Sequence, residues 1–584
     1  MNDKRANGST RLQPAGGLSR WLPGLALLVR YPKDALRGDT VAGLSAFLVM
    51  IPSVLAYSEL IGVPPVTGLY AALGAMIGYA LFSRGVPVIA GPDATTALLA
   101  AAVVAPLAAG DPARTAALAA ALPLVAGVML VIASRLQVGD IADLLSKPVL
   151  VGFLNGAALI LIGTQLGKIL GVQLTRDQFF LRVAEAIGKL PSAHLPTLAL
   201  GVALVALVFA LKRFLPLVPG SLAVCVVAIG LVFALDLPAQ GVELLGDVPQ
   251  GLPVPHLPAV GFRDLIELVP GALATATLIF AEGILLARAI AARHRQEIDS
   301  NSELEALGTA NIAAGIVGGF AVCGSTSRTM IAAATGGRTQ LAQWIAAALL
   351  VLFMLVLAPL LKWLPIVALA ALLIYVGMTM IDWDGADLLR RLEPRAFRLS
   401  LGVTLGVLVL GMLPGILVGV ALSVLRLLID TARPRDAVLR RLAPDHRYHD
   451  LDADQPGEAP PGVLIYRLYA PLIFANARYV TGRVKRLVAS AATPVRCVVF
   501  DLQAVTHMDI TAMEVFDELL DELTAAKIDI RFAHANRPLR EQLMRLGLTT
   551  HIGEDRFFHA AWEAVGDWAK ARNDPPPGTE RPPP

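Results

Sequence analysis

Two charged side chains, Glu282 and Arg328, stand in apolar stretches of the sequence. Glu282 interrupts the apolar run that begins near Leu265, and Arg328 belongs to residues 324–329 (GSTSRT), which precede an Ala-rich stretch. A carboxylate or guanidinium at membrane depth costs about 2.5–3.5 kcal/mol on insertion scales. Two such groups, beside a Gly/Ser/Thr cluster that can open a helix N-terminus, indicate a site between helices that binds and releases an ion. This chemistry is typical of a transporter.

The composition places these residues in a polytopic membrane protein. Of the 584 residues, 55% are hydrophobic and 16% are charged, whereas a soluble protein carries about 25% charged residues. The net charge of +3 is too small to imply nucleic-acid binding. The three cysteines lie far apart and form no CxxC pair, so neither a disulfide framework nor a zinc site is expected. No catalytic constellation and no cofactor site is apparent, so we do not expect an enzyme.

The sequence contains fourteen apolar segments, and each full one approaches the length of about 20 apolar residues that a bilayer requires. Two of them begin at polar residues, Asp93 and Ser325, and are short. Residues 1–39 are polar and basic, lack a secretory signal and are expected to lie along the cytoplasmic face. Together the spans form a transport domain over residues 40–431. The predicted spans are 40–61, 65–82, 93–110, 115–134, 144–171, 194–213, 216–236, 266–289, 304–321, 326–337, 340–362, 365–381, 397–412 and 414–430.

The basic residues between the spans give the orientation. With the N-terminus inside, the cytoplasmic loops carry about twice as many basic residues as the outer loops, in agreement with the positive-inside rule. An even number of spans then places both termini in the cytoplasm, and we expect a multi-pass protein of the inner (plasma) membrane. The residues assigned to the cytoplasmic side are Arg84, Arg135, Lys147, Lys212, Arg213, Arg288, Arg293, Arg295, Arg390, Arg391, Arg395 and Arg398.

A weak internal symmetry relates the two halves of the chain. Residues 51–53 (IPS) interrupt the first span, and residues 91–96 (GPDATT) then open a half-length helix. In the second half Glu282 interrupts the eighth span, and residues 324–327 (GSTS) open another half-length helix. Such corresponding segments are the signature of a seven-plus-seven inverted repeat. Half-helices that meet head to head near the midplane would offer an anion two sets of unpaired N–H groups, and Arg328 would add a full positive charge.

Three ordered stretches resemble the sulfate permease (SulP) family of anion transporters: DTVAGLSAFLVMIPSVLAYSELIGVPPVTGLYAAL (39–73), GPDATTALL (91–99), and residues 280–342, which begin FAEGILLARAIAARHRQEIDSNSELEALG. The resemblance implies a fourteen-span fold in which a core domain moves against a gate domain, and it implies a homodimer. Carried over to this sequence, it implies an anion site lined from span 1, from the two half-length helices and from the carboxylate of span 8. These residues are Pro52, Ser53, Tyr57, Ala94, Thr95, Glu282, Ser327 and Arg328.

Three positions depart from the family pattern. Ser53 stands where many relatives have Gln, Asp93 where an uncharged residue is usual, and Gly283 where Ser is common. These departures bear on the identity of the substrate more than on the fold.

Each site residue also has a structural interpretation. Glu282 could pair with the backbone or an arginine, Arg328 could snorkel or pair with Glu282, and Tyr57 could serve only packing. For Asp93 we favour capping of its half-length helix, because a negative charge inside an anion site would oppose binding.

Glu282 suggests how transport is driven. Desolvation favours the protonated form of a carboxylate, so Glu282 could take up and release a proton near neutral pH. We therefore predict secondary active transport of a small anion. Sulfate is the first candidate substrate, and proton symport is the expected mode of coupling. Sodium coupling is the alternative, although relatives resembling sodium-coupled bicarbonate transporters have Asp at this position. Bicarbonate or C4-dicarboxylate transport, exchange, an uncoupled anion channel and a transport-inactive sensor are the other hypotheses.

After Asp430 the sequence changes character. Residues 432–462 form a charged, Pro-containing linker, and residues 463–572 alternate strands and helices as a small α/β domain. LIYRLYAPLIFANARYV and VVFDLQAVTHMDITAMEVFDEL resemble the STAS domain, which implies a cytoplasmic protein partner. Thr511 falls where related antagonists carry a phosphorylatable Ser, but we favour helix capping by Asp509 or Thr511. His507, His551 and His559 show no metal-ligand spacing, and residues 573–584 are disordered by composition.

Overall fold

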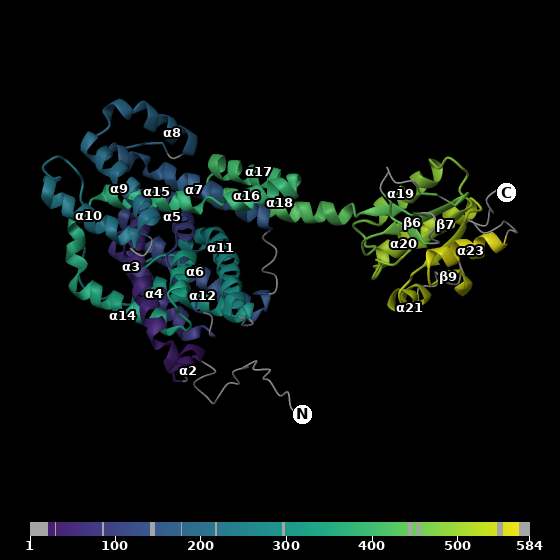
Figure 1. Ribbon diagram of the computed structural model, residues 1–584, viewed down its shortest axis with the longest axis horizontal. Helices are drawn as coiled ribbons and strands as arrows, with labels where there is room; N and C mark the ends of the chain where they lie inside the picture. The colour runs from purple at the N-terminus through teal and green to yellow at the C-terminus, as the bar shows by residue number, and fades with distance from the viewer. Residues whose placement is uncertain are drawn as a thin grey trace. The chain divides into compact units, whose positions relative to one another are not determined.

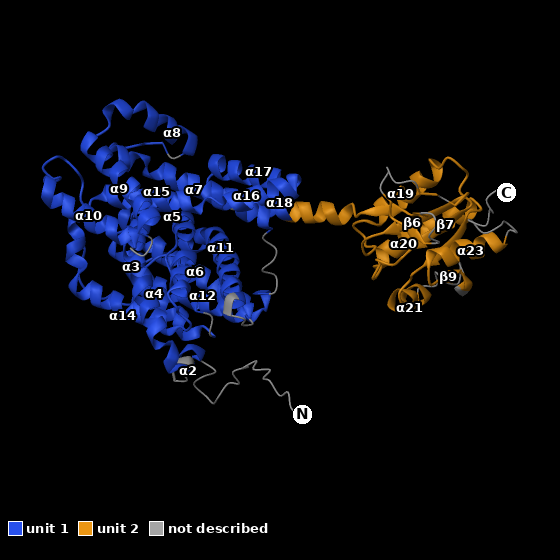
Figure 2. Cartoon of the chain, in the orientation of Figure 1, with its two compact units in different colours: residues 1–423 blue, residues 424–584 orange. Residues whose placement is uncertain are grey.

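The computed structural model divides the chain into two compact units, residues 1–423 and 424–584 (Figures 1 and 2). The first unit is helical, and the second combines helices with a sheet. The structure describes residues 22–29, 31–84, 87–139, 146–176, 178–215, 219–294, 298–441, 447–451, 457–458, 460–545 and 553–571.

A helix forms at each of the fourteen predicted spans. Among the described residues, seven helical stretches are long and apolar enough to cross a membrane, and four shorter apolar helices accompany them. The fourteen helices are α3 (Leu36–Ile61), α4 (Val66–Phe82), α5 (Ala94–Ala108), α6 (Pro112–Arg135), α7 (Lys147–Leu170), α9 (Leu195–Phe214), α10 (Gly220–Leu235), α11 (Phe262–His294), α12 (Ser300–Ile316), α13 (Thr326–Ala334), α14 (Leu341–Val356), α15 (Ile366–Met380), α17 (Pro394–Leu410) and α18 (Met412–Ala432).

The helices expected to be interrupted are continuous. α3 runs through Pro52, and α11 runs through Glu282. Proline removes one backbone donor from a helix, but membrane helices tolerate this where neighbouring side chains compensate. Pro52 takes the helical donor away from the carbonyl of Leu48, and the next side chain, Ser53 Oγ, donates to the adjacent carbonyl, Val49 O, at 3.1 Å. A buried charge likewise leaves the backbone ladder of its own helix intact.

Two short strands join the half-helices. β1 (Ala90–Gly91) precedes α5, and β2 (Cys323–Gly324) precedes α13. They pair antiparallel, with Ala90 opposite Gly324. Because each strand leads directly into a helix, the pairing brings the N-termini of α5 and α13 together in the interior of the unit.

The helices of the first unit pack in two groups. α12 packs mainly against α4 and α6, α3 packs against α13 and α14, and α11 packs against α5 and α6. In the second group α7 packs mainly against α15 and α17, and α15 packs against α9. We call these the α12 group and the α7 group. They meet where α3 contacts α10 and α15.

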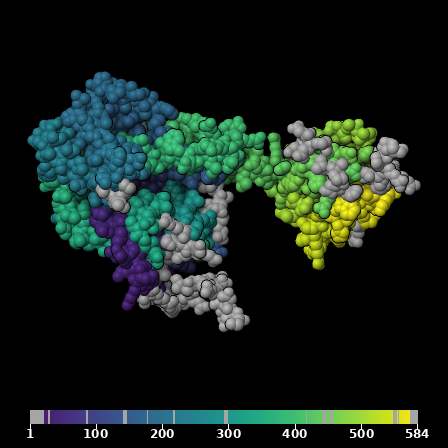
Figure 3. Space-filling model, viewed as in Figure 1, coloured from purple at the N-terminus to yellow at the C-terminus, as the bar shows by residue number. Residues whose placement is uncertain are grey.

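Three further α-helices among the described residues of this unit do not correspond to predicted spans. They are α2 (Pro23–Val29), α8 (Phe179–Gly188) and α16 (Trp383–Leu392). α8 lies with α9 and α10 in the blue region that covers one side of this unit in Figure 3. α16 connects α15 to α17.

The second unit is built on a five-stranded sheet of order β3-β6-β7-β8-β9. β6 (Val463–Leu468), β7 (Cys497–Asp501), β8 (Asp529–Ala533) and β9 (Phe557–Phe558) are parallel, and β3 (Asp436–Val438) is antiparallel to β6. The helices are α19 (Ala477–Ala489), α20 (Ile510–Ala525), α21 (Arg537–Arg545) and α23 (Ala561–Ala571). Stacked Phe500 and Phe532 lie in its core beside Phe516.

β3 lies inside residues 432–462, which the sequence suggested as linker. The short pair β4 (Arg440–Arg441) and β5 (Tyr448–His449) lies there as well. Ala437 and Leu439 supply this edge with buried apolar side chains. The charged residues around them hide that pattern in the sequence.

Candidate functional site

The site is built where the two half-helices begin. Ser325 N donates to Ile89 O at 3.0 Å, and Ile89 N donates to Thr329 Oγ1 at 3.0 Å. These bonds add to the β1–β2 pairing and fix the start of α13 against the strand that leads into α5. The first N–H groups of both helices therefore open onto one region, which favours an anion.

Arg328 joins the two half-helices. It lies in the first turn of α13, and its side chain is buried. Its Nη2 donates to Pro92 O at 2.7 Å, just before α5. Within the described part of the chain its Nε has no hydrogen-bond partner. A buried guanidinium with a free N–H is costly, so this position suits a ligand that accepts a hydrogen bond.

Gly91 makes room for this guanidinium. A Cβ at residue 91 would lie 3.0 Å from Arg328 Nη2, so the guanidinium would have to shift by a few tenths of an ångström to accept another residue.

Glu282 approaches the same region from α11. It is partly buried, and its Oε2 accepts a hydrogen bond from Thr95 Oγ1 at 2.7 Å. Thr95 lies in the first turn of α5 and is buried. No ion pair between Glu282 and Arg328 occurs among the described residues. The two charges are held by separate partners on either side of the start of α5.

Asp93 lies between those partners in the chain. It is the N-cap residue of α5, but its carboxylate makes no capping bond, contrary to the capping role that we favoured. Its backbone carbonyl instead accepts from Ala97 N at 2.9 Å. The carboxylate interacts electrostatically with Glu282 and Arg328. The N-terminal N–H groups of α5 are therefore not occupied by this side chain.

The remaining predicted residues take different positions. Tyr57 is buried in α3 and interacts electrostatically with Asp93 and Arg328, so it lies near both half-helices. Ala94 is buried at the start of α5. Ser327 is exposed, with its Oγ 3.4 Å from Ser325 Oγ. Pro52 and Ser53 lie one turn before Tyr57 on α3, with Pro52 buried and Ser53 partly buried.

Two buried amides that the sequence analysis did not single out hold the strands. Gln343 accepts a hydrogen bond from Ala90 N and donates to Met76 O, both at 2.8 Å. Asn311 accepts from Val322 N at 3.0 Å and donates to Val322 O at 2.9 Å. Gln343 stands among apolar residues in α14, and this isolation is the signal that could have found it. Asn311 lies in α12 among several other polar residues, so the sequence offers no such signal there.

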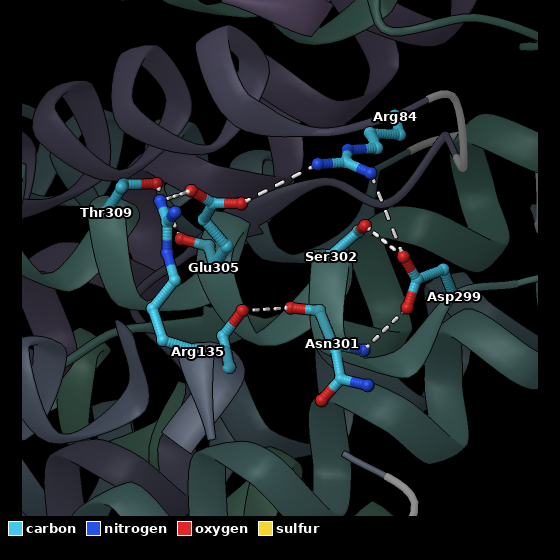
Figure 4. Close-up of polar contacts among 8 residues, drawn as sticks. Arg84, Arg135, Asp299, Asn301, Ser302, Glu305 and Thr309 are labelled. Atoms are coloured by element: carbon cyan, nitrogen blue, oxygen red, sulfur yellow. Dashed lines mark hydrogen bonds and ion pairs between the residues drawn. The ribbon is translucent and has the colours of Figure 1, made fainter. Parts of the chain in front are cut away.

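A polar network fixes the end of α12 that begins at Ser300 (Figure 4). Glu305 pairs with Arg135 at 2.6 Å and with Arg84 at 3.9 Å. Asp299 caps α12 by accepting from Asn301 N at 3.0 Å, and it lies 3.8 Å from Arg84. These contacts tie α12 to α6 and to the loop after α4, so the helices of the α12 group are held together.

In the second unit Asp509 caps α20, because its Oδ1 accepts from Ala512 N at 2.8 Å. Thr511 is exposed in the first turn of that helix. His551 lies outside the described residues. Among the residues that are described, no three His, Cys, Asp or Glu side chains are grouped so that they could hold a metal ion.

Two half-length helices whose N-termini meet beside a buried arginine, within a bundle of membrane-length helices, define an inverted-repeat membrane transporter. The sulfate permease family matches residues 36–402, and the STAS domain matches residues 457–563. The chain belongs to the sulfate permease family and carries a STAS domain. Members of this family are anion transporters, not enzymes.

Relatives extend the likeness over nearly the whole chain. A probable sulfate transporter of Mycobacterium tuberculosis is 39% identical over 93% of this chain and 97% of its own length. The chloroplastic sulfate transporter 4.1 of Arabidopsis thaliana is 26% identical over 90% of this chain and 79% of its own length.

Two solved structures are similar in fold. The murine solute carrier 26 family member A9 anion transporter, in its inward-facing state, superposes with a TM-score of 0.85, 21% identity and 97% coverage of both chains. The transmembrane domain of the cyanobacterial bicarbonate transporter BicA gives a TM-score of 0.58 at 25% identity. It covers 68% of this chain and 98% of its own.

Proposed function

We propose that this protein is a secondary active transporter that carries sulfate together with a proton, holding the anion between the N-termini of α5 and α13. The observation that carries the proposal is Arg328, a buried guanidinium where the two half-helices meet, whose Nε has no partner among the residues that the structure describes. A tetrahedral oxyanion can accept from this group and from helix N-terminal N–H groups at once. The names of the relatives favour sulfate over other oxyanions.

Charge balance supports proton coupling. Asp93 and Glu282 place two carboxyl groups near one arginine. With both carboxyl groups ionised, a dianion would meet a net negative site. Protonation of Glu282 removes one negative charge, so proton binding and sulfate binding favour each other. Thr95 can hold the carboxyl group in either state, because a hydroxyl both donates and accepts.

Transport would proceed by alternating access. The α12 group carries both half-helices, Arg328 and Glu282, so the whole site moves as one body if this group shifts against the α7 group. We place the protein in the inner membrane as a homodimer, with both termini and the STAS domain cytoplasmic. A protein partner would bind the STAS domain.

Bicarbonate is the second candidate substrate. The likeness to the transmembrane domain of a bicarbonate transporter favours it. Glu282 is relevant to which ion drives transport and not to which anion is carried. Sodium is the alternative to the proton as the driving ion. C4-dicarboxylates share the same chemistry of recognition.

The test is uptake by proteoliposomes that contain the purified full chain. Radiolabelled sulfate, bicarbonate and fumarate would each be offered with an inward proton gradient, an inward sodium gradient or neither. We expect sulfate to accumulate with the proton gradient and to leak out when a protonophore collapses it. Sulfate uptake that is the same with and without either gradient would contradict symport and would indicate a channel or an exchanger. Uptake of bicarbonate alone would overturn the choice of substrate.

A further inference from the structure

The hydroxyl group of Thr95 is used differently from that of its neighbour Thr96. Both residues lie in the first turn of α5, and both are buried. Thr96 Oγ1 donates to Asp93 O at 3.0 Å, which is the kind of local backbone bond that threonine makes in helices. Thr95 Oγ1 instead donates to Glu282 Oε2 of α11 at 2.7 Å. The Thr95 hydroxyl therefore joins two elements of the site.

Thr95 also stands beside the place that we propose for the anion. Side chains of an α-helix lean toward its N-terminus, so a hydroxyl in the first turn of α5 lies at the end where the backbone N–H groups are unpaired. That end meets the start of α13, because β1 pairs with β2. Arg328 Nη2 reaches Pro92 O there, at 2.7 Å. The Thr95 hydroxyl is thus placed between the carboxyl group of Glu282 and the anion.

The protonation state of Glu282 decides what this hydroxyl can donate to. A threonine hydroxyl has one proton to donate, and its oxygen also accepts. While Glu282 is ionised it only accepts, so the Thr95 proton points to Oε2. Once Glu282 is protonated, its O–H can donate to Thr95 Oγ1 across the same 2.7 Å. The Thr95 proton is then released to an oxygen of the anion, and the heavy atoms keep their places.

We propose that Thr95 relays the protonation of Glu282 to the anion. Its hydroxyl donates to Glu282 while that carboxyl group is ionised, and to the anion once the carboxyl group carries a proton. This inference rests on the proposed function, and it names Thr95 Oγ1 as the atom through which proton and anion favour each other. The loss of a negative charge acts in the same direction but needs no hydroxyl, so substitution separates the two effects.

Other titratable groups surround Glu282. Asp93 faces it from the start of α5, and the Cys323 thiol faces it from β2. On α12, Glu303 interacts with the same thiol and accepts a hydrogen bond from the Tyr79 hydroxyl at 2.6 Å. On α11 itself the positions three and four residues away are apolar. The basic residues of α6 stand near its two ends and pair with acids: Arg114 with Asp264, and Arg135 with Glu305.

The test is sulfate binding to the purified full chain, followed by isothermal titration between about pH 5.5 and about pH 9. We expect Thr95→Val to weaken binding about tenfold at the lowest pH, where the hydroxyl donates to the anion. At the highest pH, where it donates to Glu282, the affinity should not fall. Thr95→Ser keeps a hydroxyl and should keep the pH dependence of the unsubstituted chain. If Thr95→Val does not fold, Thr95→Ala makes the same comparison.

Two controls assign the effect. In Glu282→Gln, which cannot titrate, adding Thr95→Val should weaken binding by the same factor at every pH. A loss that still varies with pH in that background would assign the dependence to another group and would overturn the relay. Thr96→Val is the matched control, because it makes the same change one residue further along at a hydroxyl that is bonded to Asp93 O. Its effect on affinity should not vary with pH.

The outcomes separate the relay from the proposed function. An equal loss at every pH in Thr95→Val alone would overturn the relay and leave Thr95 as a simple contact of the anion. A pH-dependent loss in Thr96→Val would overturn it as well. Sulfate binding to the unsubstituted chain that is the same at every pH would contradict both symport and the relay. No sulfate binding at any pH would contradict the proposed substrate, and the relay with it.

Discussion

At the residue scale, the site depends on how one guanidinium is shared. Arg328 uses one N–H to bind Pro92 O, and within the described ranges its Nε has no hydrogen-bond partner. An arginine can do both because its donors form a rigid planar fork, whereas a lysine carries a point charge with rotating donors. Because the position is buried, a substitution there should change the affinity for the anion strongly, since an unpaired charge in a low-dielectric site is costly.

Arg328→Lys and Arg328→Gln should therefore differ. Hydrogen bonds to charged groups are worth about 1.5–3 kcal/mol, so we expect Arg328→Gln to weaken sulfate binding by about a hundredfold. Arg328→Lys should weaken it by about tenfold, because the charge remains while the fork is lost. Isothermal titration of the purified variants measures both. Arg338→Gln is the control, because that arginine lies nearby in sequence but is 65% exposed; equal effects at both positions would contradict a binding role for Arg328.

Asp93 gives a prediction of opposite sign. Its carboxylate makes no capping bond and interacts electrostatically with Arg328. Removing this negative charge should favour a dianion at the site, so Asp93→Asn should raise the apparent affinity for sulfate severalfold. The stability of α5 should change little, since no capping bond is lost. Concentration dependence of uptake measures the affinity, and a weakened affinity would show that Asp93 assists binding instead.

At the element scale, an ion pair among the described residues joins the two groups of helices. Lys168 Nζ of α7 lies 2.8 Å from Glu59 Oε1 of α3, and both side chains are partly exposed. Such a pair contributes only about 0–1 kcal/mol, so it can break during a transport cycle. It nevertheless marks a point where the α12 group and the α7 group touch.

Cross-linking this point should stop transport. In Glu59→Cys/Lys168→Cys, a short reagent that links two thiols and is cleaved by reduction should lower uptake by at least about tenfold if the groups must separate. Reduction should restore it. The three native cysteines are buried, so the background reaction is small, and each single variant treated in the same way is the control. Full uptake by the linked protein would show that the two groups keep this contact throughout the cycle.

The sequence predicted the helices well and the contacts between them poorly. Fourteen apolar runs located the spans because a bilayer imposes length and hydropathy on each one separately. The breaks before Ala94 and Thr326 predicted the half-helices. Sequence patterns did not reveal that Gln343 holds β1, or that Thr95 rather than Arg328 holds Glu282. These pairings join residues far apart in the chain, and local periodicity carries no information about them.

At the scale of the whole molecule, Glu185 of α8 shows how pH acts on a carboxyl group that lies outside the anion site. Hydrogen bonds from Lys189, and from the backbone N–H groups of Arg176 and Thr175, lower the pKa of Glu185 in α8 to about 2. A lowered folded-state pKa stabilises the protein above the unfolded pKa, and this contribution is lost only as pH falls through about 2. Glu185 thus stays ionised over the range in which transport is measured and does not add to its pH dependence.

Linkage between proton and anion should appear in the stability of the whole chain. A ligand that binds only the folded protein stabilises it by about 2.7 kcal/mol at a hundred times its dissociation constant. If sulfate prefers the form in which Glu282 is protonated, a fixed sulfate concentration should raise the melting temperature more at pH 5.5 than at pH 7.5. In Glu282→Gln, which imitates the protonated carboxyl group, the shift should be large and equal at both pH values.

Arg328→Gln should show no shift at either pH, which separates binding at the site from a general effect of salt. Chloride at equal ionic strength is the second control. An equal sulfate shift at both pH values in the unsubstituted protein would remove the thermodynamic basis of symport through Glu282, even if sulfate is carried. If sulfate still raises the melting temperature of Arg328→Gln, the anion binds somewhere other than between the half-helices. The two results are distinguishable because coupling resides in Glu282 on α11, whereas binding resides in Arg328 on α13.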